Sequence, residues 1–166
     1  MSPVQARDAE TVLETKITRI WTLLSAFEES SAACISDMLL HVSNGAYIEG
    51  SLMAAKFIVH VEVLFNAMDQ LEMLTLRASG QRMQYQKEAK LLCRKIVNFF
   101  SLLSRTYEIG VRRLGITQEL LSLVTGLAHY LKILIRLALT ASLRLVATLR
   151  PRLLIRRNKI TKTPLH

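Results

Sequence analysis

Apolar residues recur at intervals of three and four positions along most of this chain, with polar residues between them. An α-helix turns once every ~3.6 residues, so this spacing places the apolar side chains on one helix face. The pattern continues long enough in four stretches to predict four long helices: residues 8–43, 47–78, 83–113 and 117–149.

Few residues interrupt these stretches, since the chain has only six Gly and three Pro among its 166 residues. Asn44-Gly45 and Ser79-Gly80 predict the ends of the first two helices, because Asn and Gly tolerate the left-handed backbone that often follows a helix. Gly115 predicts the end of the third. Short connections favour antiparallel neighbours. The predicted fold is therefore all-α, an antiparallel up-down bundle of four long helices.

Pro151 predicts the end of the fourth helix, because the residue before a proline is driven away from helical geometry. Residues 151–166 show no apolar stripe and are rich in Lys and Arg. We therefore expect one helical bundle domain over residues 1–150, followed by a basic, disordered C-terminal tail over residues 151–166.

Charge is distributed very unevenly along the chain. Residues 1–80 hold 5 Lys and Arg against 10 Asp and Glu, a net charge of −5. Residues 81–166 hold 17 Lys and Arg against 3 Asp and Glu, a net charge of +14, so that the whole chain carries +9. Such asymmetry indicates that the basic part attracts phosphates, anionic lipid or an acidic protein.

The strongest functional signal is the basic side of the fourth predicted helix. Leu131, Leu134, Ile135 and Leu139 form one side, and the opposite side is polar and basic. No Asp or Glu occurs from residue 120 to the end of the chain, whereas a solvated helix face normally mixes both signs. We expect the basic face and tail to bind a partner through Lys132, Arg136, Arg144, Arg150, Arg152, Arg156 and Arg157.

These features predict a non-catalytic intracellular interaction module or scaffold that docks an acidic protein. The alternative is a peripheral membrane protein that binds anionic lipid through the same basic amphipathic helix. Nucleic acid is a weaker candidate partner, since the stretch after Tyr130 has no aromatic side chain on which bases could stack. Self-association is a further possible interaction. Apolar residues gather at the first connection and form a candidate protein contact: Met38, Leu40, Tyr47 and Ile48.

No motif in the sequence names a reaction. Cys34, Asp37 and His41 share a helix face and include zinc-ligand types, but three ligands on one helix rarely close a tetrahedral site. His60 and Glu62 are two positions apart and therefore point away from each other on a helix. We expect neither an enzyme nor a bound metal or cofactor.

The sequence also bears on the compartment. The first ten residues lack an apolar run behind a positive segment, so no signal peptide is predicted. Cys34 and Cys93 both fall within helical patterns, and we expect them to be buried free thiols in a reducing environment. We therefore expect the protein to be cytoplasmic, with membrane association as a second possibility. Residues 120–149 approach the apolar content of a membrane span, but Lys132 and Arg136 at the centre argue against one.

Overall fold

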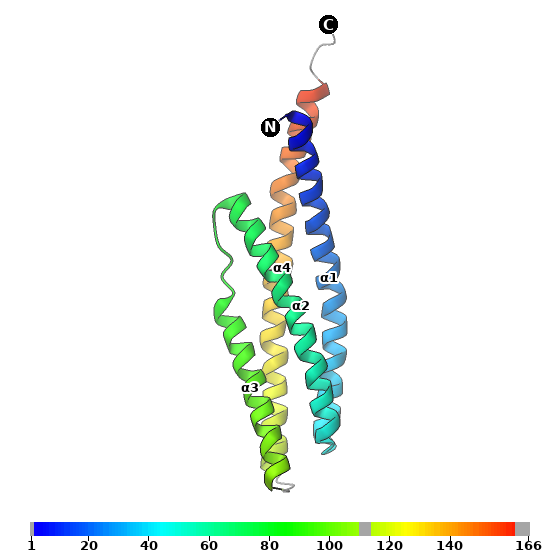
Figure 1. Cartoon of the computed structure of the whole chain (residues 1–166), viewed down its shortest axis with the longest axis vertical. Helices are drawn as coiled ribbons and strands as arrows, with labels where there is room; N and C mark the ends of the chain where they lie inside the picture. Colours follow the sequence, from blue (N-terminus) through cyan, green and yellow to red (C-terminus); the bar gives the residue numbers. More distant parts are fainter. Residues whose placement is uncertain (1, 110–113, 162–166) are drawn as a thin grey trace.

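The computed structural model describes residues 2–109 and 114–161, and within these residues the chain is all-helical. It forms four helices, α1 (Pro3–Ser43), α2 (Tyr47–Ser79), α3 (Gln86–Ile109) and α4 (Leu114–Thr161). Successive helices run in opposite directions, as Figure 1 shows. The predicted up-down bundle of four long helices is therefore confirmed.

Helix α1 begins five residues before the predicted start, because the chain has a capping box there. The backbone N–H of Gln5 donates to Ser2 Oγ at 3.2 Å, and the N–H of Ser2 donates to Gln5 Oε1 at 3.0 Å. Pro3 then occupies the first turn, where a missing N–H costs nothing. These bonds satisfy N–H groups that a helix end otherwise leaves free.

The first two connections have the glycine geometry that the sequence predicts. Gly45 and Gly80 have φ values of 73° and 71°, in the left-handed region that favours glycine. Residues 81–85 are not helical, so α3 begins at Gln86 instead of near Met83. Its predicted end, close to Arg113, falls outside the described residues.

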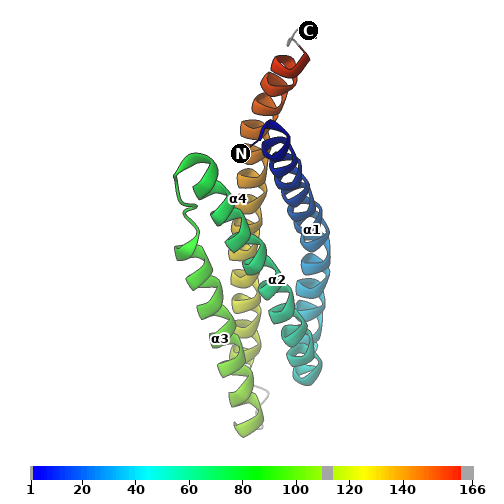
Figure 2. The same ribbon diagram turned by 45° about the horizontal axis from the view of Figure 1, so that its top comes forward.

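Helix α4 is the central element of the packing. It contacts α1, α2 and α3, whereas α2 and α3 make few contacts with each other. Figures 1 and 2 show α2 and α3 leaning on α4 from different sides, with α1 along its other flank. One continuous apolar core fills the space between them, and its fully buried members include Leu24, Phe57, Met68, Phe99, Leu120, Leu127 and Leu134.

The C-terminal end of α4 corrects the sequence-based prediction. The helix passes through Pro151 and ends at Thr161, so residues 151–161 are helical and do not belong to a disordered tail. A proline inside a helix removes one hydrogen bond and crowds the preceding turn, yet a long helix absorbs this by bending. In Figure 2 these last turns extend past the N-terminal end of α1. Residues 162–166 lie outside the described part of the chain.

By length and composition, the part of α4 from Gly115 to Leu149 could also cross a membrane. The core helix of a bundle meets the same criteria. Here Leu120, Leu127 and Leu134 are covered by the neighbouring helices, and Lys132 and Arg136 interrupt the apolar sequence. In the described structure this part of α4 is the core helix of the bundle.

The apolar residues near the first connection are only partly available. Met38 is fully buried, which contradicts its expected role in a contact surface, while Leu40 and Ile48 are exposed. Tyr47 is half-buried, and its hydroxyl is hydrogen-bonded to the hydroxyl of Thr117 at the start of α4. This bond connects the beginning of α2 to the beginning of α4.

Leu134→Ala should destabilise the bundle strongly. Leu134 has no exposed surface, so the substitution leaves a cavity and should cost about 2–5 kcal/mol of unfolding free energy. Leu143→Ala on the same helix is the control, because Leu143 is 56% exposed and should change stability by less than about 0.5 kcal/mol. Denaturant unfolding followed by circular dichroism measures both. Equal losses would mean that this face of α4 is not the buried one.

Candidate partner-binding site

The basic face of α4 lies where the sequence predicts. Lys132, Arg136 and Arg144 are exposed. Leu131, Leu134 and Ile135 are buried in the core, and Leu139 is half-buried against it. The helix period alone accounts for this division, because burying the leucine stripe leaves the cationic positions outside.

Four further predicted residues lie near the end of α4. Arg150, Arg152, Arg156 and Arg157 have helical backbones, but their side chains fall outside the described part of the structure. Their role in binding therefore stays a prediction. They belong to a helix and not to a disordered tail, so the helix holds them at fixed spacings along the α4 axis.

Part of the basic face opens into a groove of about 910 Å³ between α4, the end of α2 and the α2–α3 connection. Arg136 and Arg144 line it from α4, and Arg82 lines it from the connection. We call this the arginine groove; the residues that line it include no Asp or Glu. Its walls also carry apolar groups, among them Met83, Ile133 and Leu137. Three guanidinium groups beside apolar walls suit a partner with both anionic and apolar groups.

Thr75 adds a polar group to the wall of the arginine groove. Its Oγ1 is covered, and it has no hydrogen-bond partner in the part of the chain that the structure describes. A covered hydroxyl without a partner costs free energy, and a bound group or a water molecule could satisfy it. Lys132, in contrast, is exposed but does not line the groove.

A hydrogen-bonded cluster holds the connection that carries Arg82. The hydroxyl of Tyr85 lies 2.9 Å from Asp69 Oδ1 and 3.1 Å from Glu72 Oε2, so two carboxylates of α2 share its proton. Burial of the ring raises the pKa of Tyr85, and the hydrogen bonds to the two carboxylates raise it further. Few other contacts join α2 to α3, so this cluster fixes how the connection lies against α2.

The structure brings no metal site together from the candidates on α1. Cys34 is buried, and its thiol donates to the carbonyl oxygen of Met53 at 3.3 Å, while Asp37 is exposed. Burial raises the pKa of the Cys34 thiol, and the nearby Asp37 carboxylate adds to this effect. Among the described residues, no group of three His, Cys, Asp or Glu side chains could hold a metal ion. Cys34 therefore serves as a packing residue of the α1–α2 interface.

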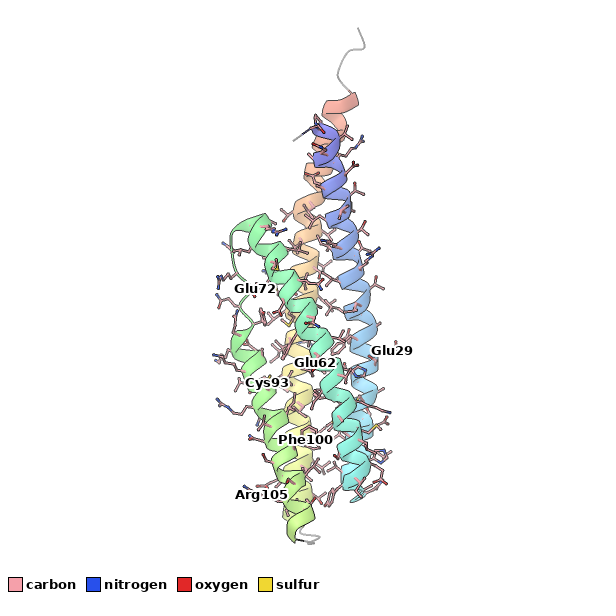
Figure 3. All side chains as sticks on the ribbon, in the orientation of Figure 1. Glu29, Glu62, Glu72, Cys93, Phe100 and Arg105 are labelled. Carbon is pink, nitrogen blue, oxygen red and sulfur yellow. The ribbon has the colours of Figure 1, made fainter. Side chains whose placement is uncertain are left out.

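Cys93 contradicts its predicted burial, because its side chain is exposed on α3. Figure 3 marks it on α3, together with Glu62 on α2. The reason is geometric: α3 packs mainly on α4, so its remaining faces stay open. His60 and Glu62 do not form an acid–base pair, since His60 Nδ1 lies 2.8 Å from the carbonyl oxygen of Lys56 and Glu62 is exposed.

Comparison with known proteins identifies two relatives of this chain. The chain is 50% identical over 145 residues, or 87% of its length, to Rho-type GTPase-activating protein 1 of Schizosaccharomyces pombe. It is 28% identical over 140 residues to Rho-GTPase-activating protein LRG1 of Saccharomyces cerevisiae. The matched segments make up only 13% and 14% of these two relatives. No protein-family model matches the chain, and no solved structure does.

These relatives contradict two sequence-based predictions. The expected scaffold for an acidic partner, with anionic lipid as its alternative, is wrong, because both relatives are named for activating Rho GTPases. The expectation that the chain has no part in catalysis is contradicted by the same names. The coarser prediction of a protein partner agrees with them. Charge and periodicity indicate which ligands are attracted, but they do not identify a partner or a reaction.

Tyr85→Phe should weaken the fold by about 0.5–1.5 kcal/mol at neutral pH, because the substitution removes hydrogen bonds to Asp69 and Glu72 without removing the buried ring. The deficit should shrink above about pH 10. In the wild type the unfolded chain then ionises Tyr85 while the folded chain, with its raised pKa, resists, so stability is lost as pH rises. Unfolding of both proteins at several pH values tests this; a constant difference would contradict it.

Proposed function

We propose that this chain takes part in stimulating GTP hydrolysis by a Rho-type GTPase. The observation that carries the proposal is the 50% identity over 87% of the chain to a Rho-type GTPase-activating protein. A relative from a second yeast, 28% identical, is named for the same activity. A cytoplasmic place of action fits this role.

The proposal concerns one segment of a longer kind of protein. The chain corresponds to about one eighth of each relative, so the activity in their names is not assigned to this part of them. What the segment offers is a rigid helical body with a cationic groove. We therefore propose that it contacts the GTPase and supports the reaction through that contact.

The arginine groove is the surface that we assign to the GTPase. Hydrolysis of GTP develops negative charge on the transferred phosphoryl oxygens, and activating proteins stabilise it with arginine supplied in trans. Arginine also dominates the energetics of many protein interfaces. The groove gathers Arg82, Arg136 and Arg144 from two parts of the chain, without a lining carboxylate to neutralise them.

The groove arginines differ in their support. Arg136 and Arg144 stand on a helix whose opposite face is buried, which suits docking, while Arg82 stands on a connection, where residues that act on a partner are often found. Further cationic residues along α4 would strengthen association with the GTPase at low ionic strength: Lys132, Arg150, Arg152, Arg156 and Arg157.

Single-turnover phosphate release from a GTP-loaded Rho-type GTPase tests the proposal. Adding the chain should accelerate release, and Arg136→Gln with Arg144→Gln should reduce the effect by about tenfold or more, because arginine is enriched among the interface residues whose truncation costs more than ~1 kcal/mol. The matched control is Lys90→Gln with Arg94→Gln, which removes the same charge from exposed positions of α3 outside the groove. Circular dichroism verifies that both variants fold.

A second arm addresses the longer relative. Deleting the matching segment from the S. pombe protein should lower its stimulation of the same GTPase. If the isolated chain gives no acceleration and the deletion leaves the relative fully active, the segment has no role in GTP hydrolysis. If only the deletion has an effect, the segment acts through the rest of the protein and not through its own groove.

A further inference from the structure

Helix α2 is apolar on two opposite faces. One face enters the core through Phe57, Leu64 and Met68, which are almost completely buried. The other face points away from the bundle and still carries large apolar side chains, with Leu52 and Val59 each 59% exposed and Met73 57% exposed. Large apolar side chains that gather on one exposed face mark a surface that binds a partner. The outer face of α2 therefore lacks a partner within the described chain.

The exposed residues follow a seven-residue repeat. One set of positions holds Leu52, Val59, Asn66 and Met73, and the set three residues later holds Ala55, Glu62, Asp69 and Leu76. All eight side chains are exposed, and together they form what we call the α2 seam. Five of the eight are apolar, and apolar residues that recur at this spacing pack one helix against another in a coiled coil.

The seam reads nearly the same from both ends. Apolar residues occupy its first part (Leu52, Ala55 and Val59) and its last part (Met73 and Leu76), and the polar residues Glu62, Asn66 and Asp69 lie between them. A two-fold symmetric dimer needs such a self-complementary surface, because the same patch must face itself. In Figure 1 α2 lies in front of α4, and no other described helix covers it from that side.

We propose that the α2 seam binds a second copy of this chain, with the two α2 helices antiparallel. A two-fold axis beside residue 64 places Leu52 opposite Leu76 of the second copy and Ala55 opposite its Met73. Glu62 then lies opposite Asn66 of the second copy, where an amide can donate to the carboxylate. A parallel pair would instead bring Glu62 against Glu62 and Asp69 against Asp69, which like-charge repulsion disfavours.

Charge around the seam supports the antiparallel orientation. A groove of about 760 Å³ runs between α1 and α2 beside Asn66 and Met73, and Lys16, Arg19 and Arg77 line it without any Asp or Glu. In the antiparallel dimer, Glu62 of the second copy lies opposite Asn66 and therefore next to this cationic groove. The least favourable pair is Val59 opposite Asp69, because an apolar side chain meets a carboxylate. The Asp69 carboxylate still accepts a hydrogen bond from the Tyr85 hydroxyl of its own chain.

Sedimentation equilibrium over a range of concentrations tests for the dimer. The wild-type chain should show reversible dimerisation, and Leu52→Glu with Met73→Glu should weaken it by about tenfold or more. The matched control is Val97→Glu with Leu143→Glu, which changes two equally exposed apolar residues outside the seam and should leave dimerisation intact. All four positions are exposed, so each variant should keep the fold, as circular dichroism will verify.

Engineered disulfides test the orientation. With Cys93→Ser in the background, an equimolar mixture of Ala55→Cys and Met73→Cys proteins should form a cross-linked pair, because only close Cα atoms can be bridged. Ala55→Cys alone should stay uncross-linked. Cross-linking of Ala55→Cys with itself would overturn the antiparallel arrangement.

Two results would overturn the proposed dimer itself. One is a wild-type chain that stays monomeric at every concentration. This result would overturn the dimer even if the α2 seam were found to bind anionic vesicles. The other is a dimer that the Leu52→Glu and Met73→Glu changes do not weaken.

Discussion

Burial of one leucine-rich stripe along α4 determines the arrangement of the whole molecule. Leu120, Leu127 and Leu134 are covered by neighbouring helices, and each such burial contributes about 1.5–3 kcal/mol relative to an exposed side chain. Helices α1, α2 and α3 all pack on α4. The rotation of α4 that buries these leucines also turns Arg136 and Arg144 outward. Core packing and the cationic face are thus two results of the same helical period.

The sequence predicts the fold well because long amphipathic stretches carry most of the information. The four helices and their antiparallel order follow from periodicity and from the breaks at Gly45 and Gly80. The predicted break at Gly115 is wrong, because Gly115 lies in the first turn of α4, which begins at Leu114. The helix ends are less predictable, since they depend on a few local bonds. Ser2 and Gln5 start α1 early by capping each other. Helix α4 continues through Pro151 to Thr161, although a proline inside a helix normally costs about 3 kcal/mol.

The candidate site is only half visible in the sequence. Helical spacing alone predicts that Lys132, Arg136 and Arg144 are exposed. It does not predict that Arg82 lies beside them, because that depends on how the α2–α3 connection is held by Tyr85 and two carboxylates. The sequence pattern also does not predict the identity of the partner. Positive charge attracts many ligands, and only the likeness to Rho GTPase-activating proteins favours one of them.

The scarcity of contacts between α2 and α3 has a consequence for partial unfolding. Helix α3 is held mainly by α4, through Leu92, Phe99 and Leu103, and by the hydrogen bonds of Tyr85. It can therefore detach without separating α1 from α2, so its opening requires less free energy than global unfolding. Backbone amides of α3 would then exchange with solvent through this local opening, and those in the centres of α1 and α4 only when the whole bundle unfolds. This packing predicts two cooperative unfolding units that share α4.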